Sequence, residues 1–330
     1  MFVMRNISIL FLTCLLISCA GMASPPTTPE AASTLSAVPT LEEPRAEIPV
    51  IGYFPDYREL NPAWAANLTD IIYFSAEPRA DGTLDTSRLS DDTWNALRQL
   101  KNEYGLRVHL SIGGWERDGA FASVSADPAL REIFVNTVLD FLLAHDLAGV
   151  DFDWEFPQTA DEFQNYIALL TETKAALESH ALLVSVALPA EAGFPLGEFA
   201  VVDRVHLMSY DRGERHSTFE QAAADVQTFL DAGIPPEKLI LGMPFYGRAV
   251  TPPFDEFSYA QLVNDYAPAR DTDEVNGIYF NGPGTIRRKV CYGIQEGLGG
   301  FMIWELSQDT SDSSSLLHTI FQLSQGEEAC

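Results

Sequence analysis

From residue 48 onward, the chain alternates short apolar runs with longer segments in which apolar residues recur every three or four positions. The short runs are apolar up to their polar ends, which is typical of strands buried on both faces of a parallel sheet. Eight strands are therefore predicted, at residues 50–54, 71–75, 108–112, 149–154, 182–188, 205–210, 239–245 and 300–304.

Segments with helical periodicity separate these strands. The clearest case places Phe134, Val138 and Phe141 on one face, and another segment begins with a plausible cap in which Thr159 precedes Glu162 by three positions. Helices are predicted at residues 91–104, 127–145, 159–179, 217–232, 285–296 and 313–325, whereas the segments after the first and fifth strands look short or irregular.

Eight strands that alternate with helices predict an α/β protein with a (β/α)8 TIM barrel. An open doubly wound sheet is the competing fold, but it often carries a phosphate-binding glycine turn. No G-x-G-x-x-G pattern follows the first strand. The barrel is therefore the favoured architecture.

Composition narrows the classes of partner. Of 330 residues, 47 are acidic and 20 are basic, so the formal net charge is -27. A surface of this charge repels DNA, RNA and anionic membrane faces, and no nucleic-acid partner is predicted. A neutral substrate such as a sugar is not repelled.

The N-terminus predicts export. Arg5 precedes an apolar run at residues 7–17 that is too short for an ordinary membrane span and is typical of a secretory signal. The run ends in L-I-S-C, which resembles the bacterial lipobox and implies a lipidated Cys19. The alternative is an ordinary signal peptide cut after Ala20 or Ala23. We expect a signal peptide at 1–18, a flexible tether rich in Pro, Ser and Thr at 19–47, and a catalytic domain at 48–330, anchored to a bacterial membrane.

Four cysteines are present. Cys14 leaves with the signal and Cys19 carries the lipid, so Cys291 and Cys330 remain in an exported domain where disulfides are allowed. They either form an intramolecular disulfide that pins the C-terminus or stay as two free thiols.

The histidines are scattered, and no H-E-x-x-H or C-x-x-C pattern occurs, so neither a metal nor an organic cofactor is predicted.

The most informative strand reads G-V-D-F-D-W-E-F-P and begins at Gly149. Because alternate residues of a strand share a face, Asp151, Asp153 and Glu155 project together, about 7 Å apart per two-residue step. Such carboxylates repel each other and resist desolvation, which raises at least one pKa and favours a carboxylic acid that stays protonated near neutral pH. Glu155 lies at the carboxyl end of its strand, where barrel active sites form, and is the natural general acid.

Two other interpretations of this strand remain. Three carboxylates can ligate a hard cation, although the glycine and glutamate of an EF-hand loop do not fit here. An exposed acidic edge strand is the second alternative, but the apolar residues between the carboxylates indicate burial.

The same residues carry a family resemblance. The segment from Ala148 to Pro157 resembles the D-G-x-D-x-D-x-E signature of glycoside hydrolase family 18, the chitinases. Three further segments match in order: S-I-G-G-W from Ser111, M-S-Y-D from Met208, and G-G-F-M-I-W ending at Trp304. The resemblance spans about residues 48–309 and implies a TIM barrel.

The resemblance also implies a retaining, substrate-assisted mechanism, for which this family is an exception to the two-carboxylate scheme. Glu155 would protonate the leaving oxygen, and the acetamido oxygen of the substrate would attack the anomeric carbon. Asp153 would orient that acetamido group, and Tyr210 would hydrogen-bond its oxygen. Asp151 would share a proton with Asp153.

Supporting roles follow from the same motifs. Trp304 and Trp115 would stack on sugar faces, since pyranoses carry apolar C–H groups that aromatic rings bury well; taken alone, each would read as a core aromatic. Tyr53 and Ser111 would be the hydrogen-bonding neighbours of Asp151. The remaining expected substrate-binding residues are Met208, Asp211, Tyr246, Arg248, Gly113 and Gly114, although the two glycines could simply mark a tight turn.

The chain departs from the family pattern at Ala148, where the family has Asp. Activity is nevertheless expected, because the proton donor and the acetamide partners remain. The segment at 247–297 is short for the sizeable α+β insertion of deep-cleft chitinases, so we expect that insertion to be absent and the groove to be shallower.

The substrate implied by the resemblance is a chitin-like N-acetylglucosamine polymer. Peptidoglycan and the chitobiose core of N-glycans remain alternatives within the same chemistry. A catalytically silent chitin-binding lectin is the alternative from another class, but such proteins typically lose the acid that Glu155 supplies here.

Overall fold

The computed structural model describes residues 47–191 and 193–330, and the predicted lipidation site at Cys19 lies outside them. Eight parallel strands pair side by side, and pairing of β1 with β2 closes the sheet into a barrel. Around the barrel the strands are β1 (Val50–Pro55), β2 (Asp70–Pro78), β4 (Arg107–Gly113), β5 (Gly149–Asp153), β6 (Leu183–Pro189), β7 (Arg204–Met208), β8 (Leu239–Pro244) and β13 (Gly300–Trp304). The (β/α)8 prediction and all eight predicted strands are confirmed.

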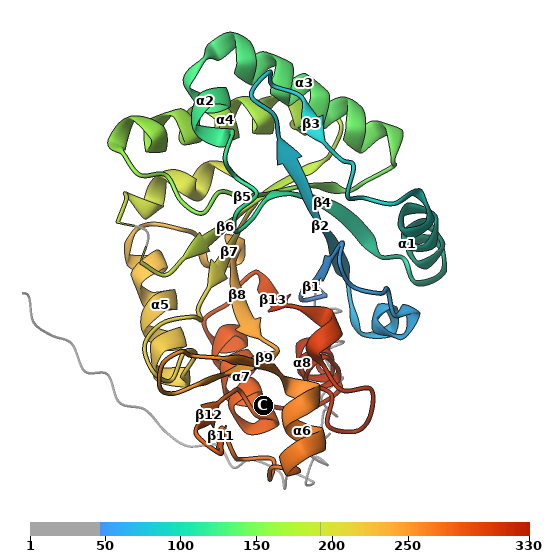
Figure 1. The fold of residues 1–330 in the computed structure, drawn as a ribbon, viewed down its shortest axis with the longest axis vertical. Coiled ribbons are helices and arrows are strands. Elements are labelled where there is room, and N and C mark those ends of the chain that lie inside the picture. Colours follow the sequence, from blue (N-terminus) through green and yellow to red (C-terminus); the bar gives the residue numbers. More distant parts are fainter. Residues whose placement is uncertain (1–46, 192) are drawn as a thin grey trace, which may run out of the picture. The chain divides into compact units, whose positions relative to one another are not determined.

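Helices surround the barrel on the outside (Figure 1). They are α1 (Asp91–Tyr104), α3 (Pro128–Ala144), α4 (Ala160–Glu178), α5 (Phe219–Asp231), α7 (Pro283–Gln295) and α8 (Leu316–Ser324), all of them predicted, together with the short α2 (Phe121–Ala126), which was not. Helix α4 begins as its cap predicts, with Thr159 accepting a hydrogen bond from the backbone N–H of Glu162 at 3.1 Å. Short 3-10 turns follow at η1 (Pro62–Asn67), η2 (Leu196–Val201), η3 (Pro236–Lys238) and η4 (Leu306–Gln308).

The segment between β8 and β13 differs from the prediction. It contains a four-stranded antiparallel sheet and helix α6 (Tyr259–Tyr266), so the expectation that an α+β insertion is absent was wrong. The strands are short: β9 (Tyr246–Ala249), β10 (Glu256–Ser258), β11 (Glu274–Val275) and β12 (Ile278–Tyr279). A further two-residue strand, β3 (Leu84–Asp85), pairs antiparallel with β2. Strands this short do not give a readable alternation of apolar and polar residues.

The interior of the barrel mixes apolar and polar side chains, whereas the layer between barrel and helices is almost wholly apolar. A small apolar cluster inside the barrel contains Ile51, Tyr53, Ile72, Phe74, Tyr210, Ile240 and Met302, with Met208 and Trp304 packed against it. Buried polar side chains, among them Asp70, Asp151 and His206, share this interior space.

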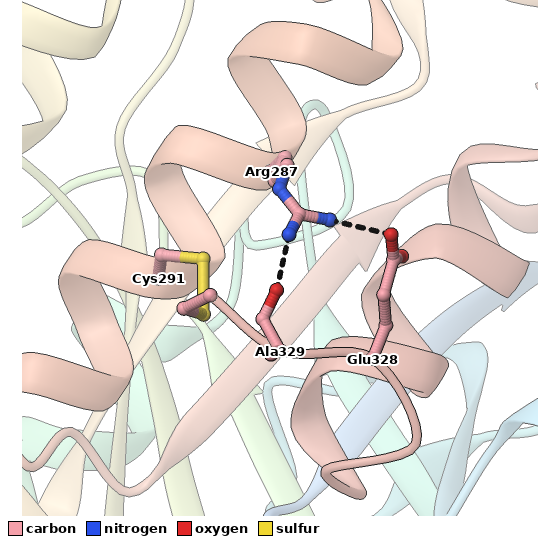
Figure 2. Close-up of a disulfide and its surroundings, with 5 residues drawn as sticks. Arg287, Cys291, Glu328 and Ala329 are labelled. Carbon is pink, nitrogen blue, oxygen red and sulfur yellow. Dashed lines mark hydrogen bonds and ion pairs between the residues drawn. A yellow bond between two sulfur atoms is a disulfide. The ribbon is translucent and has the colours of Figure 1, made fainter.

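A disulfide joins Cys291 of α7 to the C-terminal Cys330, with the two Cα atoms 5.5 Å apart (Figure 2). Figure 2 also shows Arg287 of the same helix directed at the carbonyl of Ala329 and at the carboxylate of Glu328, 2.8 Å away. Of the two alternatives for these cysteines, the structure therefore has the paired one, and the last residues of the chain are held against α7.

Candidate active site

Strand β5 places its carboxylates as the alternation predicted. Phe152 and Trp154 face outward, where the Trp154 ring packs against Phe121 and Tyr166 at centroid distances of 5.6 and 5.2 Å. Asp151 is fully buried inside the barrel, and Asp153 is 4% exposed. The acidic side chains are thus on the inner side, at increasing height toward the carboxyl end of the strand.

A cavity of about 600 Å³ lies at this carboxyl end, where barrel enzymes carry their sites. Nine of the predicted site residues line it: Tyr53, Trp115, Asp153, Glu155, Met208, Tyr210, Asp211, Arg248 and Trp304. Residues that sequence reasoning did not single out complete the lining: Phe156, Ala187, Pro189, Ala190, Glu191, Arg212, Glu256 and Met302.

Two carboxyl groups of the cavity hold their protons unusually strongly. Burial raises the pKa of Glu155 to about 7, with a further contribution from the charge of Asp118, while a hydrogen bond from the Trp115 backbone acts in the opposite direction. Burial, followed by the charges of Glu155 and Asp151, raises the pKa of Asp153 well above its ordinary value. A protonated carboxylic acid near neutral pH is what a general acid requires.

Asp151 lies below this pair and accepts several hydrogen bonds. The Tyr53 hydroxyl donates to it at 2.7 Å, as predicted, and the Ser185 hydroxyl donates at 2.5 Å. The prediction that Ser111 donates to Asp151 was wrong, because the Ser111 hydroxyl is buried without any partner. Ser185 and His206, which contact Asp151 from β6 and β7, were missed because both interrupt apolar strands that read simply as core.

The proton that the resemblance places between Asp151 and Asp153 stays a prediction. Asp153 Oδ1 is buried without a partner. Asp153 thus lines the cavity with a carboxyl group of which one oxygen receives no hydrogen bond from the described residues.

The end of β7 contributes Met208, Tyr210 and Asp211 to the cavity. Asp211 accepts hydrogen bonds from the Tyr246 hydroxyl at 2.7 Å and from Arg248 at 3.1 Å. Burial alone would raise the pKa of Asp211, but the nearby His216 and the hydrogen bonds from Tyr246 and Arg248 lower it overall. Tyr246 does not line the cavity, in contrast to its predicted substrate contact; it lies behind Asp211 and holds that side chain in place.

Gly113 and Gly114 do not line the cavity either, but they shape its rim. Both adopt positive φ, at 97° and 98°. A Cβ on Gly113 would lie 2.3 Å from the carbonyl oxygen of Asp153, and one on Gly114 would lie 2.2 Å from the Phe74 ring. Only glycine permits this turn, which carries Trp115 to the rim with 68% of its surface exposed.

Trp304 ends β13 and lies in the lining of the cavity. The rings of Tyr53 and Phe74 meet its ring edge-on, at centroid distances of 5.7 and 4.9 Å. This packing fixes the orientation of Trp304, so that its indole offers an apolar surface of the kind that binds a pyranose face.

In residues 47–191 and 193–330, no cluster of three or more metal-ligating side chains occurs, and no helix is long and apolar enough to cross a membrane.

Comparison with known proteins decides the family. The model of the glycosyl hydrolases family 18 matches residues 49–309. The chain belongs to this family. Chitinase 1 of Aphanocladium album is 28% identical to the family 18 chain over 78% of the chain and 79% of the relative. Chitinase A1 of Niallia circulans is also 28% identical, over 69% of the chain but only 46% of that longer relative.

Solved structures agree with the barrel of the family 18 chain. The GH18 chitinase ChiB from the chitin utilization locus of Flavobacterium johnsoniae is 26% identical, with a TM-score of 0.74, over 85% of this chain and 94% of that one. A chitinase from Bacteroides thetaiotaomicron superposes with the same TM-score of 0.74, over 86% of this chain and 99% of that one; at 22% identity it supports the fold alone.

Proposed function

We propose that this chain hydrolyses chitin or chitooligosaccharides, which are β-1,4-linked polymers of N-acetylglucosamine, with retention of configuration at the anomeric carbon. The observation that carries the proposal is the pairing of Asp153 and Glu155 in one cavity, both with raised pKa values, beside Tyr210 and the Trp304 ring. The relatives named above are chitinases, which favours chitin over other N-acetylglucosamine polymers.

In the first step, Glu155 gives its proton to the glycosidic oxygen while the bond from that oxygen to the anomeric carbon breaks. The carbonyl oxygen of the 2-acetamido group forms the new bond to the anomeric carbon, which yields an oxazolinium ion. Asp153 orients the acetamido group through its N–H and stabilises the positive charge, and the Tyr210 hydroxyl donates to the acetamido oxygen.

In the second step, the Glu155 carboxylate takes a proton from water. The oxygen of that water bonds to the anomeric carbon and breaks its bond to the acetamido oxygen. Glu155 is thereby returned to its protonated form, the acetamide is restored, and the product has the configuration of the substrate.

The test compares two oligosaccharides of equal length and linkage. The protein should cleave N-acetylchitotetraose and release products that are first seen as the β-anomer by NMR. It should leave cellotetraose intact, because that substrate lacks the acetamido group that forms the intermediate. Cleavage of both at similar rates, or first appearance of the α-anomer, would contradict substrate assistance.

We further propose that the chain is a lipoprotein, with a signal peptide at 1–18, a tether at 19–47 and the catalytic domain at 48–330. The support is the L-I-S-C sequence at the end of the apolar run and the Pro-, Ser- and Thr-rich segment that follows it. Labelled palmitate supplied to bacteria that express the full chain should be incorporated into the protein and should be absent from Cys19→Ala. Equal labelling of both proteins would exclude Cys19 as the lipidation site.

A further inference from the structure

His206 occupies an unusual place under the candidate active site. It lies on β7, two residues before Met208, and its side chain points into the barrel with 1% of its surface exposed. The imidazole meets the Tyr53 ring edge-on, at a centroid distance of 6.0 Å and an interplanar angle of 83°. It does not line the cavity, so any influence on the reaction passes through its neighbours.

The hydrogen bonds around His206 define which of its atoms carries a proton. Tyr53 Oη lies 2.7 Å from Asp151 Oδ2 and 2.9 Å from His206 Nδ1. Because the single Tyr53 proton goes to the carboxylate, the phenol oxygen can only accept from the imidazole. The N–H at Nδ1 therefore donates to Tyr53 Oη, and the same nitrogen lies 3.2 Å from Asp151 Oδ1.

The other ring nitrogen supports this assignment. His206 Nε2 is buried and has no hydrogen-bond partner. A hydrogen there would be a buried donor without an acceptor. It would also leave Nδ1 without the hydrogen that the Tyr53 oxygen accepts. The geometry therefore places an imidazole hydrogen on Nδ1.

We propose that His206 is a positioning residue of the active site, which holds the Asp151 carboxylate as a fixed acceptor beneath Asp153. Tyr53 and Ser185 donate to the two oxygens of Asp151, and His206 holds the Tyr53 donor in place through its Nδ1 hydrogen. The inference rests on the proposed function, because its consequence is measured on hydrolysis.

The consequence concerns Asp153. Tyr53 and Ser185 hold the two oxygens of Asp151 from β1 and β6, and His206 on β7 keeps the Tyr53 hydroxyl in place, so the carboxylate next to Asp153 on β5 stays at one position. The negative charge of Asp151 then stays at a constant place below the acetamido group when that group becomes positive. Loss of the His206 donor would leave the Tyr53 hydroxyl, and through it the Asp151 carboxylate, free to move, and a misplacement of about 1 Å in such a site costs as much as a hundredfold in rate.

Three variants separate positioning from mere packing. His206→Asn places an amide nitrogen near the position of Nδ1, His206→Gln reaches toward Nε2 instead, and His206→Leu removes every donor. We expect kcat on N-acetylchitotetraose to fall about tenfold or more in the Leu and Gln variants, with KM within about threefold of wild type. The Asn variant should keep kcat within about threefold of wild type.

The matched control is His109→Asn, because His109 is a buried histidine that contacts Asp70 at 2.8 Å at the other end of the barrel. It should lower the free energy of unfolding while leaving kcat near that of wild type. If His206→Leu does not fold, the comparison of the Asn and Gln variants decides. Equal kcat in those two, or wild-type kcat in a folded Leu variant, overturns the proposal.

A spectroscopic measurement is independent of catalysis. The 15N chemical shifts of the imidazole in the wild-type protein should report hydrogen on Nδ1 and a free lone pair on Nε2, and hydrogen on Nε2 alone would overturn the proposal. If wild-type protein does not cleave N-acetylchitotetraose at all, the proposed function fails, whereas this measurement still decides the geometry claimed for His206.

Discussion

Carboxylates are buried at both ends of this barrel, and the two ends treat them in opposite ways. At the amino end, Asp70 is fully buried and accepts hydrogen bonds from Thr69, Arg107, His109 and Arg204, all at 2.6 to 2.9 Å. At the carboxyl end, Asp153 has a buried oxygen with no partner.

The difference appears in their proton affinities. Burial disfavours the charged form of Asp70, but the hydrogen bond from His109 and the charges of Arg204 and Arg107 outweigh it and place the pKa of Asp70 well below its ordinary value. Burial also disfavours ionisation of Asp153, and there the neighbouring charges are those of Glu155 and Asp151, which raise its pKa further. An aspartate thus has a lowered pKa at one end of the barrel and a raised pKa at the other.

The lesson is that burial of a carboxylate does not identify an active site. What distinguishes the reactive end is the sign of the surrounding charges, and the opening of a cavity of about 600 Å³ onto the carboxyl groups. Variants at the carboxyl end should therefore lower activity with little change in stability. Variants at the amino end should lower stability with little change in activity.

The largest effect on activity is expected for Glu155→Gln. The amide cannot donate a proton to the leaving oxygen, so kcat on N-acetylchitotetraose should fall by about a thousandfold or more. Stability should be unchanged or slightly higher, because the variant removes an acid that resists ionisation where it is. Glu178→Gln, an exposed site on α4, is the matched control and should keep wild-type kcat. Turnover of Glu155→Gln close to wild type would refute the assignment of the acid.

For Asp70→Asn we expect a loss of stability with activity retained. Removing one partner of a buried ion pair typically costs about 3–5 kcal/mol of unfolding free energy. The lower end of that range applies here, because the Arg107 side chain is 43% exposed and regains water. Denaturant unfolding should show the loss, with exposed Asp92→Asn as its control, while kcat per folded molecule stays within about twofold of wild type. A large drop in kcat without destabilisation would mean that the two ends are coupled.

The carboxyl end was largely predictable from sequence, for a physical reason. A strand has a period of two, so Asp151, Asp153 and Glu155 share a face wherever the strand lies. The eight strands could be predicted equally well, because buried parallel strands appear in the sequence as continuous apolar runs. Aligning the neighbouring strand β6 with β5 would also have identified Ser185, because it is the residue that pairs with Asp151.

The rest depended on contacts that no local pattern encodes. Asp118 acts on Glu155 from the irregular loop after β4, where neither period applies. Asp70 gathers its partners from β4 and β7, at sequence separations of 37, 39 and 134 residues. Glu256 lines the cavity from a three-residue strand of an insertion that the spacing of the main strands did not predict.

The dependence on pH should separate the two ends within one protein. Since the pKa of Glu155 is about 7, the reactive acid is progressively lost above that pH, and kcat/KM should fall about tenfold per unit. A rate that does not change between pH 6 and pH 9 would exclude Glu155 as the acid.

Stability should follow the same two groups with opposite sign. The pKa of Glu155 is raised above its ordinary value of 4.5, so its contribution is fully present below that value and is lost as pH rises through about 7. The pKa of Asp70 is lowered from 3.8, so its contribution is present above that value and is lost as pH falls further. Urea unfolding as a function of pH should show both changes, and Glu155→Gln should remove only the upper one.

The smallest effect is expected at Ala148, where the family signature has Asp. This residue and Arg107 line a surface hollow of about 470 Å³ at the amino end, so Ala148→Asp has room and a favourable cation nearby. Glu155 lies seven positions after residue 148, or about 23 Å along extended chain, which exceeds the screening length of about 8 Å at physiological salt. The new charge should therefore leave the pH profile of kcat/KM unshifted and change the unfolding free energy by less than about 1 kcal/mol. Ala148→Asn, of the same shape without charge, is the control. A pH profile that moves in the Asp variant but not in the Asn variant would show that charge at the amino end reaches the reactive acid, and that the separation of the two ends is incomplete.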